Sequence, residues 1–590
     1  MRKSGRPARS GAPFLPAGAT RLLAAVALLL LAASPAVADG RAVGDTLTVI
    51  MRPILPVSEI VVPGDSFTIE AMAPQSTTGW TAQLTRGADV LPLTVDSASY
   101  SSSHERWFLT ATVPPDTPSE MYGLAVTASG GILDVADHAV MVRTSIEDDF
   151  YFMHITDTHL VTHKYWYQSG ADTDTTEMSD LHAVIDDINI INPAFVLLTG
   201  DIINEGELED FMDKRYYTRA QRIMQRFNMP VYMIAGNHDI GGWDDTPPSD
   251  GTARRNWWKF FGWRYLNDPP SGDGVYTQNY SFDYGQVRFI GIESYNNYDD
   301  WRRNIYGDDS FTDDQLDWLV DDIGTVSPAT PIVLFYHKDF QDQLNLGSLG
   351  VDGALYGHIH YTDGDINAHP FNLSTETVCD DERAMRLVRV SGTSVSPTEP
   401  IDAGGSGGNL RLLFDAPNDG SQTELTATVD NNQPEDFDYG MIRFLVDAAE
   451  APYEVDNGTI TQTLVDGDVA TVYVQVAMPA YSNTYVTITP DESSGIESTA
   501  VLALAGPAFP NPATTGARMR FTMGAPGRVR VDVYDVAGRL VATPVTGHRS
   551  AGEHSVTWDL EGRNDVPSGI YLYRIEALGQ RVTGKLVVLR

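Results

Sequence analysis

Five short polar segments of the chain could together hold a pair of metal ions. They are Asp157-Thr-His159, Gly200-Asp201, Gly236-Asn237-His238-Asp239, His337 and Gly357-His358-Ile-His360. The candidate ligands among them are two carboxylates, one amide and four imidazoles: Asp157, Asp201, Asn237, His159, His337, His358 and His360. Oxygen and imidazole donors suit borderline divalent cations, and dinuclear hydrolytic sites hold two ions about 3.5–4 Å apart. The pattern therefore predicts two divalent ions with one carboxylate shared between them.

Apolar runs typical of buried strands precede four of these segments, at residues 152–155, 195–198, 231–234 and 332–335. Open α/β folds place their sites where the ends of neighbouring strands meet. We therefore expect the donor side chains to converge at one edge of a sheet.

Helical patterns alternate with these strands. A first helix should be capped by Ser179, end near Pro193 and bury residues 181, 184, 185 and 188. A second should span 207–227, with residues 208, 211, 223 and 224 facing inward. A third should begin with a capping box at 312–315 and bury residues 316, 319 and 323. A strand pair at 280–283 and 287–292 and a last strand at 386–390 complete the predicted domain.

The order and chemistry of the five segments resemble the calcineurin-like metallophosphoesterase superfamily. The resemblance implies an α/β fold, a four-layer α/β/β/α sandwich. By motif position it implies that Asp201 bridges two divalent ions, of Mn, Fe or Zn. One ion would be completed by Asp157, His159 and His360, and the other by Asn237, His337 and His358.

The resemblance also implies a mechanism in which a metal-bound hydroxide is the nucleophile. His238 would protonate the leaving oxygen as general acid, with Asp239 as the partner that orients it. Because His238 can protonate a poor alkoxide leaving group, we favour a phosphodiester over a phosphomonoester as the small-molecule substrate. Purple acid phosphatases place a tyrosine ligand soon after the aspartate of the second motif. In this chain Asp201 is followed by Ile202-Ile203-Asn204, so no tyrosine ligand is available there.

Three features near the motifs are open to interpretation. Asn204 could contact a phosphoryl oxygen or cap the following helix. The aromatic cluster at 257–263 could line the substrate cleft, although packing against the domain is favoured. The single cysteine, Cys379, excludes an internal disulfide and is expected to be an unreactive thiol in a polar loop. His154, inside the first strand, is expected to be a core histidine.

The rest of the chain predicts flanking all-β, immunoglobulin-like sandwiches. We expect a signal peptide at 1–38, an N-terminal β-sandwich at 39–147, the catalytic domain at 148–400, a second β-sandwich at 401–495 and a C-terminal immunoglobulin-like domain at 506–590. A basic start, an apolar stretch at 22–33 and Ala36-Val37-Ala38 are typical of a cleaved secretory signal. No transmembrane segment is expected in the mature chain.

The C-terminal segment differs from the rest in charge, with eleven Lys and Arg against seven Asp and Glu from residue 507 onward. Its turns and strands, including Asn511-Pro512, Gly538-Arg539 and the closing run 585–590, resemble the sorting domain of type IX secretion, which is similar to the immunoglobulin-like domain of flagellar hook-capping proteins. That resemblance implies a bacterial protein, secreted or attached to the cell surface, with type IX-like secretion machinery as a partner.

The formal net charge of −39 disfavours nucleic acid as substrate, because such a surface repels polyanions. A nuclease is therefore the weakest of the hydrolase hypotheses. A cell-surface adhesin or scaffold with a vestigial metal domain is the alternative from another class. Vestigial sites usually lose ligands, whereas all seven are present here.

Overall fold

The structure is a computed structural model that describes residues 49–589, apart from 88, 161–175, 205, 207–215, 241–255, 258–259, 262–278, 295–310, 312, 341–342, 405–408, 492–501, 537, 561 and 564–565. The predicted signal peptide lies outside the described residues. Within the described part of the chain, no helix is both long and apolar enough to cross a membrane.

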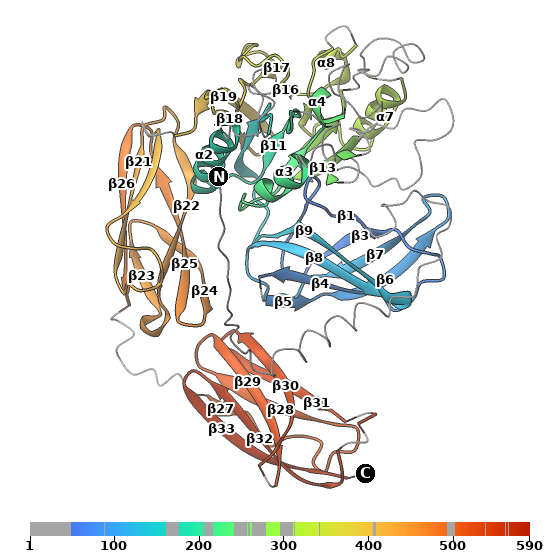
Figure 1. Ribbon diagram of the computed structural model, residues 1–590, viewed down its shortest axis with the longest axis vertical. Helices are drawn as coiled ribbons and strands as arrows, with labels where there is room; N and C mark the ends of the chain where they lie inside the picture. The colour runs from blue at the N-terminus through green and yellow to red at the C-terminus, as the bar shows by residue number, and fades with distance from the viewer. Residues whose placement is uncertain are drawn as a thin grey trace, which may run out of the picture.

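Two five-stranded sheets form the centre of the catalytic domain (Figure 1). The first has the order β12-β11-β10-β18-β19, in which β10–β12 run parallel and β18 and β19 are antiparallel: β10 Asp149–Ile155, β11 Val196–Leu198, β12 Val231–Met233, β18 Ala384–Ser391 and β19 Ser394–Asp402. The second has the order β13-β14-β15-β16-β17, parallel from β14 onward: β13 Asn279–Tyr284, β14 Val287–Ile292, β15 Ile332–Phe335, β16 Gly353–Tyr356 and β17 Phe371–Ser374.

The two sheets pack face to face through apolar side chains that alternate along each strand. In β10, Phe150 and Phe152 join the core between the sheets, whereas Tyr151 and Met153 join the core on the outer face. This period of two follows from the strand geometry, because successive side chains point to opposite faces. Phe152 also stacks on Phe195 of the neighbouring strand region, with ring centroids 5.2 Å apart.

Helices cover both outer faces and complete the expected four layers. α2 (Thr176–Ile191) and α3 (Tyr216–Met224) pack on the first sheet, and α7 (Asp313–Ile323) packs on the second. A short helix α4 (Asn237–Ile240) carries the third motif, and α8 (Leu346–Leu349) lies between β15 and β16. The α/β/β/α prediction is thus confirmed. The predicted inward residues 181, 184, 185, 188, 223, 224 and 319 are buried, and 316 and 323 are partly buried.

Two local predictions are wrong. The described part of α2 already begins at Thr176, so Ser179 lies inside the helix and is not its cap. The strand predicted at 386–390 is β18, but β19 follows it and pairs with it as the sheet edge. Residues 208, 211 and 312 of the other predicted helices lie outside the described residues.

Three all-β sandwiches flank this domain, as expected for immunoglobulin-like units. The N-terminal one pairs sheets β1-β3-β7-β6 and β2-β9-β8-β4-β5: β1 Ile50–Arg52, β2 Glu59–Val61, β3 Ser66–Ala71, β4 Thr81–Arg86, β5 Asp89–Pro92, β6 Thr94–Ser101, β7 Arg106–Thr112, β8 Met121–Ala128 and β9 Ile132–Val142. The next pairs β20-β21-β26-β23 and β22-β25-β24: β20 Leu410–Phe414, β21 Leu425–Asn431, β22 Phe437–Asp447, β23 Tyr453–Asp456, β24 Thr459–Asp466, β25 Val469–Met478 and β26 Ser482–Pro490.

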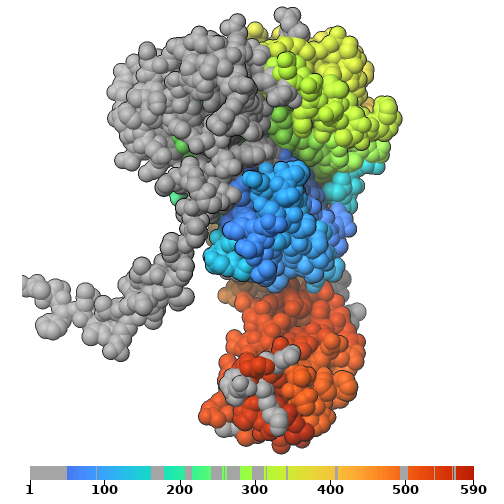
Figure 2. Space-filling view, turned by 90° about the vertical axis from the view of Figure 1, so that its right-hand side faces the viewer, coloured from blue at the N-terminus to red at the C-terminus, as the bar shows by residue number. Residues whose placement is uncertain are grey.

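The C-terminal sandwich has its own core and pairs β27-β28-β31 with β30-β29-β32-β33: β27 Ala503–Leu504, β28 Gly516–Met523, β29 Gly527–Asp535, β30 Leu540–Arg549, β31 Gly552–Asp559, β32 Gly569–Ala577 and β33 Gln580–Val588. Short 3-10 turns at Ser129–Gly131 and Ala448–Glu450 precede β9 and β23. Figure 2 shows the N-terminal sandwich, in blue, between the catalytic domain and this C-terminal sandwich.

The first two sandwiches also pack on the catalytic domain and on each other. The hydroxyl of Tyr151 accepts a hydrogen bond from the Tyr439 N–H of β22 at 3.2 Å. Between the sandwiches, the buried carboxylate of Glu120 accepts a hydrogen bond from the Tyr473 hydroxyl and lies 3.6 Å from an Arg86 nitrogen. The β22–β25 sandwich is therefore anchored to the catalytic domain at the side of the first sheet.

The buried Asp187 of α2, where the catalytic domain meets the residues before β20, should make stability depend on pH. Burial raises its pKa to about 7, the neighbouring Asp186 adds to this, and the Gly404 N–H and Arg383 only partly oppose it. An unfolded aspartate ionises near pH 4, so the folded chain loses stability between about pH 4 and 7. We expect Asp187→Asn to remove that loss, raising the free energy of unfolding on the order of 2–4 kcal/mol at about pH 8 and little at about pH 4, measured by chemical denaturation.

Candidate metal centre

Loops that follow five strands bring all seven predicted ligands to one end of the two sheets. Asp157 and His159 follow β10, Asp201 follows β11, Asn237 follows β12, His337 follows β15, and His358 and His360 follow β16. The loops after β10 and β11 continue side by side beyond the strands, through hydrogen bonds from the His159 N–H to the Asp201 carbonyl oxygen and from the Leu160 N–H to the Ile202 carbonyl oxygen. The first sheet thus holds two of the motifs against each other through the backbone.

One group of donors gathers around the Asp157 carboxylate. Asp157 Oδ1 lies 3.3 Å from His360 Nε2 and 3.7 Å from His159 Nε2, and these two imidazole nitrogens are 3.1 Å apart. Ligands at 2.0–2.2 Å from one ion are about 3–3.6 Å from each other. The three atoms therefore have the spacing of donors around a single cation.

A second group gathers around the Asn237 amide oxygen. Asn237 Oδ1 lies 2.8 Å from His358 Nδ1 and 3.0 Å from His337 Nε2, and these two nitrogens are 3.3 Å apart. The Asp201 carboxylate stands between the groups, because its Oδ2 is 3.0 Å from His337 Nε2 and 3.8 Å from His159 Nε2. One oxygen thus faces both groups, and the division of ligands is the one that the motif order implies.

The surrounding hydrogen bonds leave the facing atoms available to cations. Asp157 Oδ2 accepts hydrogen bonds from the His358 N–H and the Thr156 hydroxyl. Asp157 Oδ1, in contrast, is buried without a hydrogen-bond partner among the described residues. His337 donates Nδ1–H to the Thr199 carbonyl oxygen at 2.7 Å, so Nε2 is the nitrogen that faces the other donors. Such contacts fix the tautomer and orientation of metal ligands. The donor set therefore fits divalent metal ions.

The electrostatics of the cluster also favour a bound cation. Burial opposes a charge on His337, yet the adjacent Asp201 carboxylate raises the pKa of His337 to about 9. Burial would raise the pKa of Asp201, but His337 and His238 lower it below its ordinary value. Without metal, a proton on His337 thus balances the Asp201 charge. Metal binding to these atoms would release that proton.

Positive backbone φ angles, which are strained for residues other than glycine, recur at the predicted ligands. Five of the seven predicted ligands have positive φ angles: Asp157 at 52°, His159 at 41°, Asp201 at 49°, His358 at 72° and His360 at 58°. A residue other than glycine held in this region costs on the order of 1–3 kcal/mol, and such residues cluster at functional sites. The fold therefore keeps these side chains converging at an energetic cost.

Comparison with known proteins agrees with this geometry. Residues 150–362 match the family model described as calcineurin-like phosphoesterase, and residues 511–580 match that of the FlgD Ig-like domain. Residues 150–362 are a calcineurin-like phosphoesterase domain. The C-terminal sandwich is a FlgD-type immunoglobulin-like domain. A search of curated proteins found no match.

Several solved structures show a limited likeness to the chain. Purple acid phosphatase PPD1 from yellow lupin (Lupinus luteus) is 10% identical over 62% of this chain and 70% of its own, with a TM-score of 0.33. A dimetal phosphatase from Danio rerio is 15% identical over 43% of this chain and 98% of its own, with a TM-score of 0.29. At these scores the likeness adds nothing to the assignment, which depends on the family match.

Two glycines of the phosphoesterase domain are required by close packing at the ligands. A Cβ on Gly357 would lie 1.9 Å from Thr156 Oγ1 and 2.5 Å from Asp157 Oδ2, and one on Gly236 would lie 2.2 Å from Asp201 Oδ1. We expect Gly357→Ala to displace Asp157, lower the metal content and lower the free energy of unfolding by about 1–3 kcal/mol.

Metal analysis and denaturation of the purified variant test this expectation. Gly347→Ala is the matched control, because its Cβ would meet only Asn345 Oδ1 at 3.7 Å. A Gly357→Ala protein with unchanged metal content and stability would contradict the packing argument.

His238 lies beside the ligands and carries its ring in a defined orientation. Its Nδ1 donates to the Asn204 carbonyl oxygen at 2.7 Å, and its ring is half-buried and 4.8 Å from the His159 ring, centroid to centroid. Because a carbonyl oxygen only accepts, Nδ1 carries the proton of this hydrogen bond. The sequence did not single out this contact, since it involves a backbone oxygen.

The predicted role of Asp239 as the partner of His238 is not what the described contacts show. The buried Asp239 carboxylate accepts the N–H groups of Ile202, Ile203 and Gly236 at 2.8–3.2 Å. These bonds tie the loop after β11 to the loop after β12, and so hold Asp201 beside Asn237. Burial, followed by the nearby Asp201 charge, raises the pKa of Asp239 to about 8.

The structure also decides several smaller predictions. His154 is a core histidine that bonds Thr375 Oγ1 and Thr199 Oγ1 at 2.7 and 2.8 Å, and burial lowers its pKa to about 3. Trp257 and Phe261 are fully buried in the core between the first sheet and the helices that cover it. This confirms the packing interpretation for these two members of the aromatic cluster. The helix that Asn204 could cap lies outside the described residues.

Cys379 lies near the site, at a place that the sequence did not predict. It is fully buried, and its sulfur lies within 4.8 Å of ligand atoms of His159 and His360. Its position after the last motif, in a polar stretch, gives no sign of this. Only the fold returns the segment to the first motif, where the Cys379 N–H donates to the Asp157 carbonyl oxygen at 3.2 Å.

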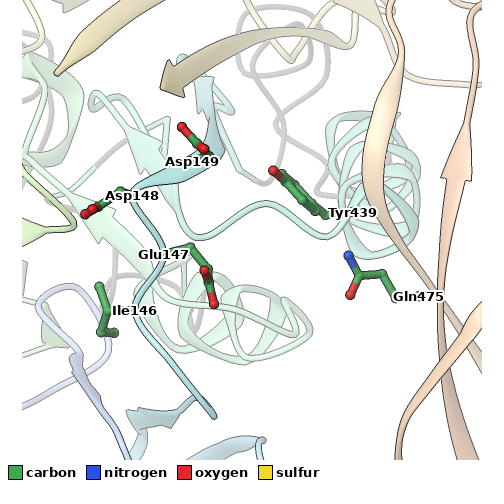
Figure 3. Close-up of a pocket in the computed structure, with 6 residues that line it drawn as sticks. All are labelled: Ile146, Glu147, Asp148, Asp149, Tyr439 and Gln475. Atoms are coloured by element: carbon green, nitrogen blue, oxygen red, sulfur yellow. The ribbon is translucent and has the colours of Figure 1, made fainter. Parts of the chain in front are cut away.

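A cavity of about 490 Å³ lies elsewhere, and Figure 3 shows its lining. Glu147, Asp148 and Asp149 line it from the segment that leads into β10, with Tyr439 and Gln475 from the adjoining sandwich. It opens at the beginning of β10, whereas the candidate ligands follow the end of that strand. Three carboxylates would repel an anionic ester, so this cavity is a poor candidate for the phosphoester site.

Proposed function

We propose that this chain is an exported phosphoesterase that uses two divalent metal ions to hydrolyse a small phosphodiester, with phosphomonoesters as the second candidate class. The observation that carries the proposal is the pair of donor groups, each of three side chains, with the Asp201 carboxylate between them. Two ions bound there would lower the pKa of a bridging water and neutralise charge on the phosphoryl oxygens. Mn²⁺, Fe²⁺ and Zn²⁺ all suit the donors.

The accessible side of the site indicates where the ester would bind. His238, His358 and His360 are half-buried, whereas Asp157, His159 and His337 have no exposed surface. A substrate therefore approaches from the side that carries His238. From there His238 Nε2 can donate a proton to the leaving oxygen, while the Asn204 carbonyl oxygen holds Nδ1–H in place.

The preference for a diester follows from this proton donor. An alkoxide is a poor leaving group, and a positioned acid typically contributes about 10²–10⁴ in rate. The acidic surface, with a formal net charge of −39, further favours a small ester over nucleic acid.

The test is an assay of the full chain after metal removal and reconstitution with Mn²⁺, Fe²⁺ or Zn²⁺. We expect no turnover without metal and faster hydrolysis of bis-(p-nitrophenyl) phosphate than of mono-p-nitrophenyl phosphate. A faster monoester reaction would overturn the diester preference. Failure to bind metal would overturn the enzyme proposal and favour the scaffold, and efficient cleavage of single-stranded DNA would favour a nuclease.

We further propose that the protein is exported by its N-terminal segment and sorted by its C-terminal domain. The basic and apolar pattern of residues 1–38 and the FlgD-type domain at 511–580 support this. Expression in a bacterium with type IX secretion, with and without residues 506–590, tests it. The full chain should reach the cell surface or medium, and the truncated chain should stay in the periplasm.

A further inference from the structure

A buried thiol adjoins the first donor group and has no part in the mechanism proposed above. The sulfur of Cys379 and ligand atoms of His159 and His360 all lie within 4.8 Å of one another. Cys379 has no exposed surface, and the same is true of Asp157 and His159. The thiol is thus enclosed with the donors of one ion.

The backbone holds Cys379 against the first motif through several contacts. The Val378 N–H donates to the Thr156 carbonyl oxygen at 3.1 Å, and the Cys379 N–H donates to that of Asp157 at 3.2 Å. The Thr377 hydroxyl also donates to the Asp157 carbonyl oxygen, at 2.7 Å, and its oxygen lies 3.0 Å from the Cys379 sulfur. The position of the thiol is therefore coupled to that of the ligand Asp157.

A second, independent observation in this group is a buried carboxylate oxygen that is suited to bind a cation. Asp157 Oδ1 is fully buried, has no hydrogen-bond partner among the described residues, and faces the same two imidazoles as the thiol. If Cys379 only filled space, we would expect apolar neighbours. Its sulfur instead lies near a hydroxyl and two imidazoles.

We propose that Cys379 is a thiolate ligand of the ion held by Asp157, His159 and His360, an inference that rests on the proposed two-metal function. On binding, the S–H bond breaks, its proton passes to solvent and a sulfur–metal bond forms, with no change of oxidation state. Thiolate favours zinc, iron or cobalt over magnesium or manganese. The first site, with the Asp157 carboxylate and the Cys379 thiolate, would then carry two more negative charges than the second, and would hold its ion more tightly.

Cobalt titration of the metal-free full chain tests this directly. A thiolate bound to Co²⁺ gives a near-ultraviolet charge-transfer band, and the chain has one cysteine, so the band would have a single source. We expect the band to grow with the first equivalent only. Cys379→Ser should remove this band. It should also lower the affinity for one of the two cobalt ions by at least about tenfold and leave the affinity for the other unchanged.

Variants of the two donor groups serve as matched controls and do not depend on the folding of Cys379→Ser. His337→Ala, in the second group, should keep the band, and His360→Ala, in the first group, should lose it. Two bound cobalt ions without a band would overturn the role of Cys379 and leave the phosphoesterase proposal intact. Absence of cobalt binding would overturn both.

Discussion

Replacing Asp201 by alanine is expected to release both metal ions and abolish phosphoester hydrolysis. The Asp201 Oδ2 atom lies 3.0 Å from His337 Nε2 and 3.8 Å from His159 Nε2, so it serves both donor groups. A single donor that stabilises developing charge is worth about 10²–10³ in rate. Because Asp201 serves two ions, we expect a larger loss than this.

The two donor groups can be separated by single variants. His360→Ala removes a donor of the Asp157 group only, and His337→Ala removes one of the Asn237 group only. Metal analysis should give about one ion per chain for each of these variants and none for Asp201→Ala. Asp438→Ala, which removes an exposed carboxylate on β22, is the control and should keep both ions. Equal metal loss in all three site variants would mean that the groups are not distinct.

The sequence was sufficient to predict where the donors lie, because each motif is anchored to a strand. The apolar run of β15 predicts a buried strand that ends at Phe335. His337 comes two residues later, so it was expected just beyond the end of the strand, at the edge of the sheet. The same reasoning applies to Asp157 after β10 and Asp201 after β11. The alternation of buried strands with helices along the chain indicates an α/β fold, whereas the four layers were implied by the family resemblance.

Residue types could not predict which atom of each side chain faces the site. Asp239 and Asp201 both follow glycine-rich turns beside the site, yet one accepts three backbone N–H groups and the other faces two imidazoles. That difference depends on the path of two loops in space. The place of Cys379 beside the first motif could not be predicted for the same reason, because β17 and the segment after it return the chain to the first motif only in the folded state.

The strained backbone was also invisible in the sequence. Positive φ is typical of glycine, and although Asp and His adopt it more often than most residues, their types do not say at which positions they will. Their conformations are imposed by neighbours such as Gly357, whose missing Cβ lets Thr156 and Asp157 approach. Part of the free energy of folding is thus used to hold the donors together before any ion binds.

His238→Ala is expected to keep both metal ions and lose turnover of esters with poor leaving groups. The ring of His238 belongs to neither donor group, although one of its nitrogens lies within 4.8 Å of ligand atoms of His159 and Asp201. Its backbone N–H donates to the Asp201 carboxylate at 2.8 Å, a contact that alanine preserves. If Nε2 delivers the proton to the leaving oxygen, an alkyl diester should be hydrolysed about 10²–10⁴ times more slowly by the variant. The rate of hydrolysis of a p-nitrophenyl diester should fall much less, because p-nitrophenolate departs without protonation.

The ratio of the two losses separates acid catalysis from simple binding. A histidine that only binds the phosphoryl group would slow both esters alike, and that result would exclude the general-acid role. A selective loss on the alkyl ester, with metal content unchanged, requires a proton donor at this position. His104→Ala, on the exposed turn between β6 and β7, is the matched control and should leave both rates unchanged. Since Asn204 holds Nδ1 through a backbone oxygen, substitution of its side chain should alter the ratio far less than loss of the imidazole.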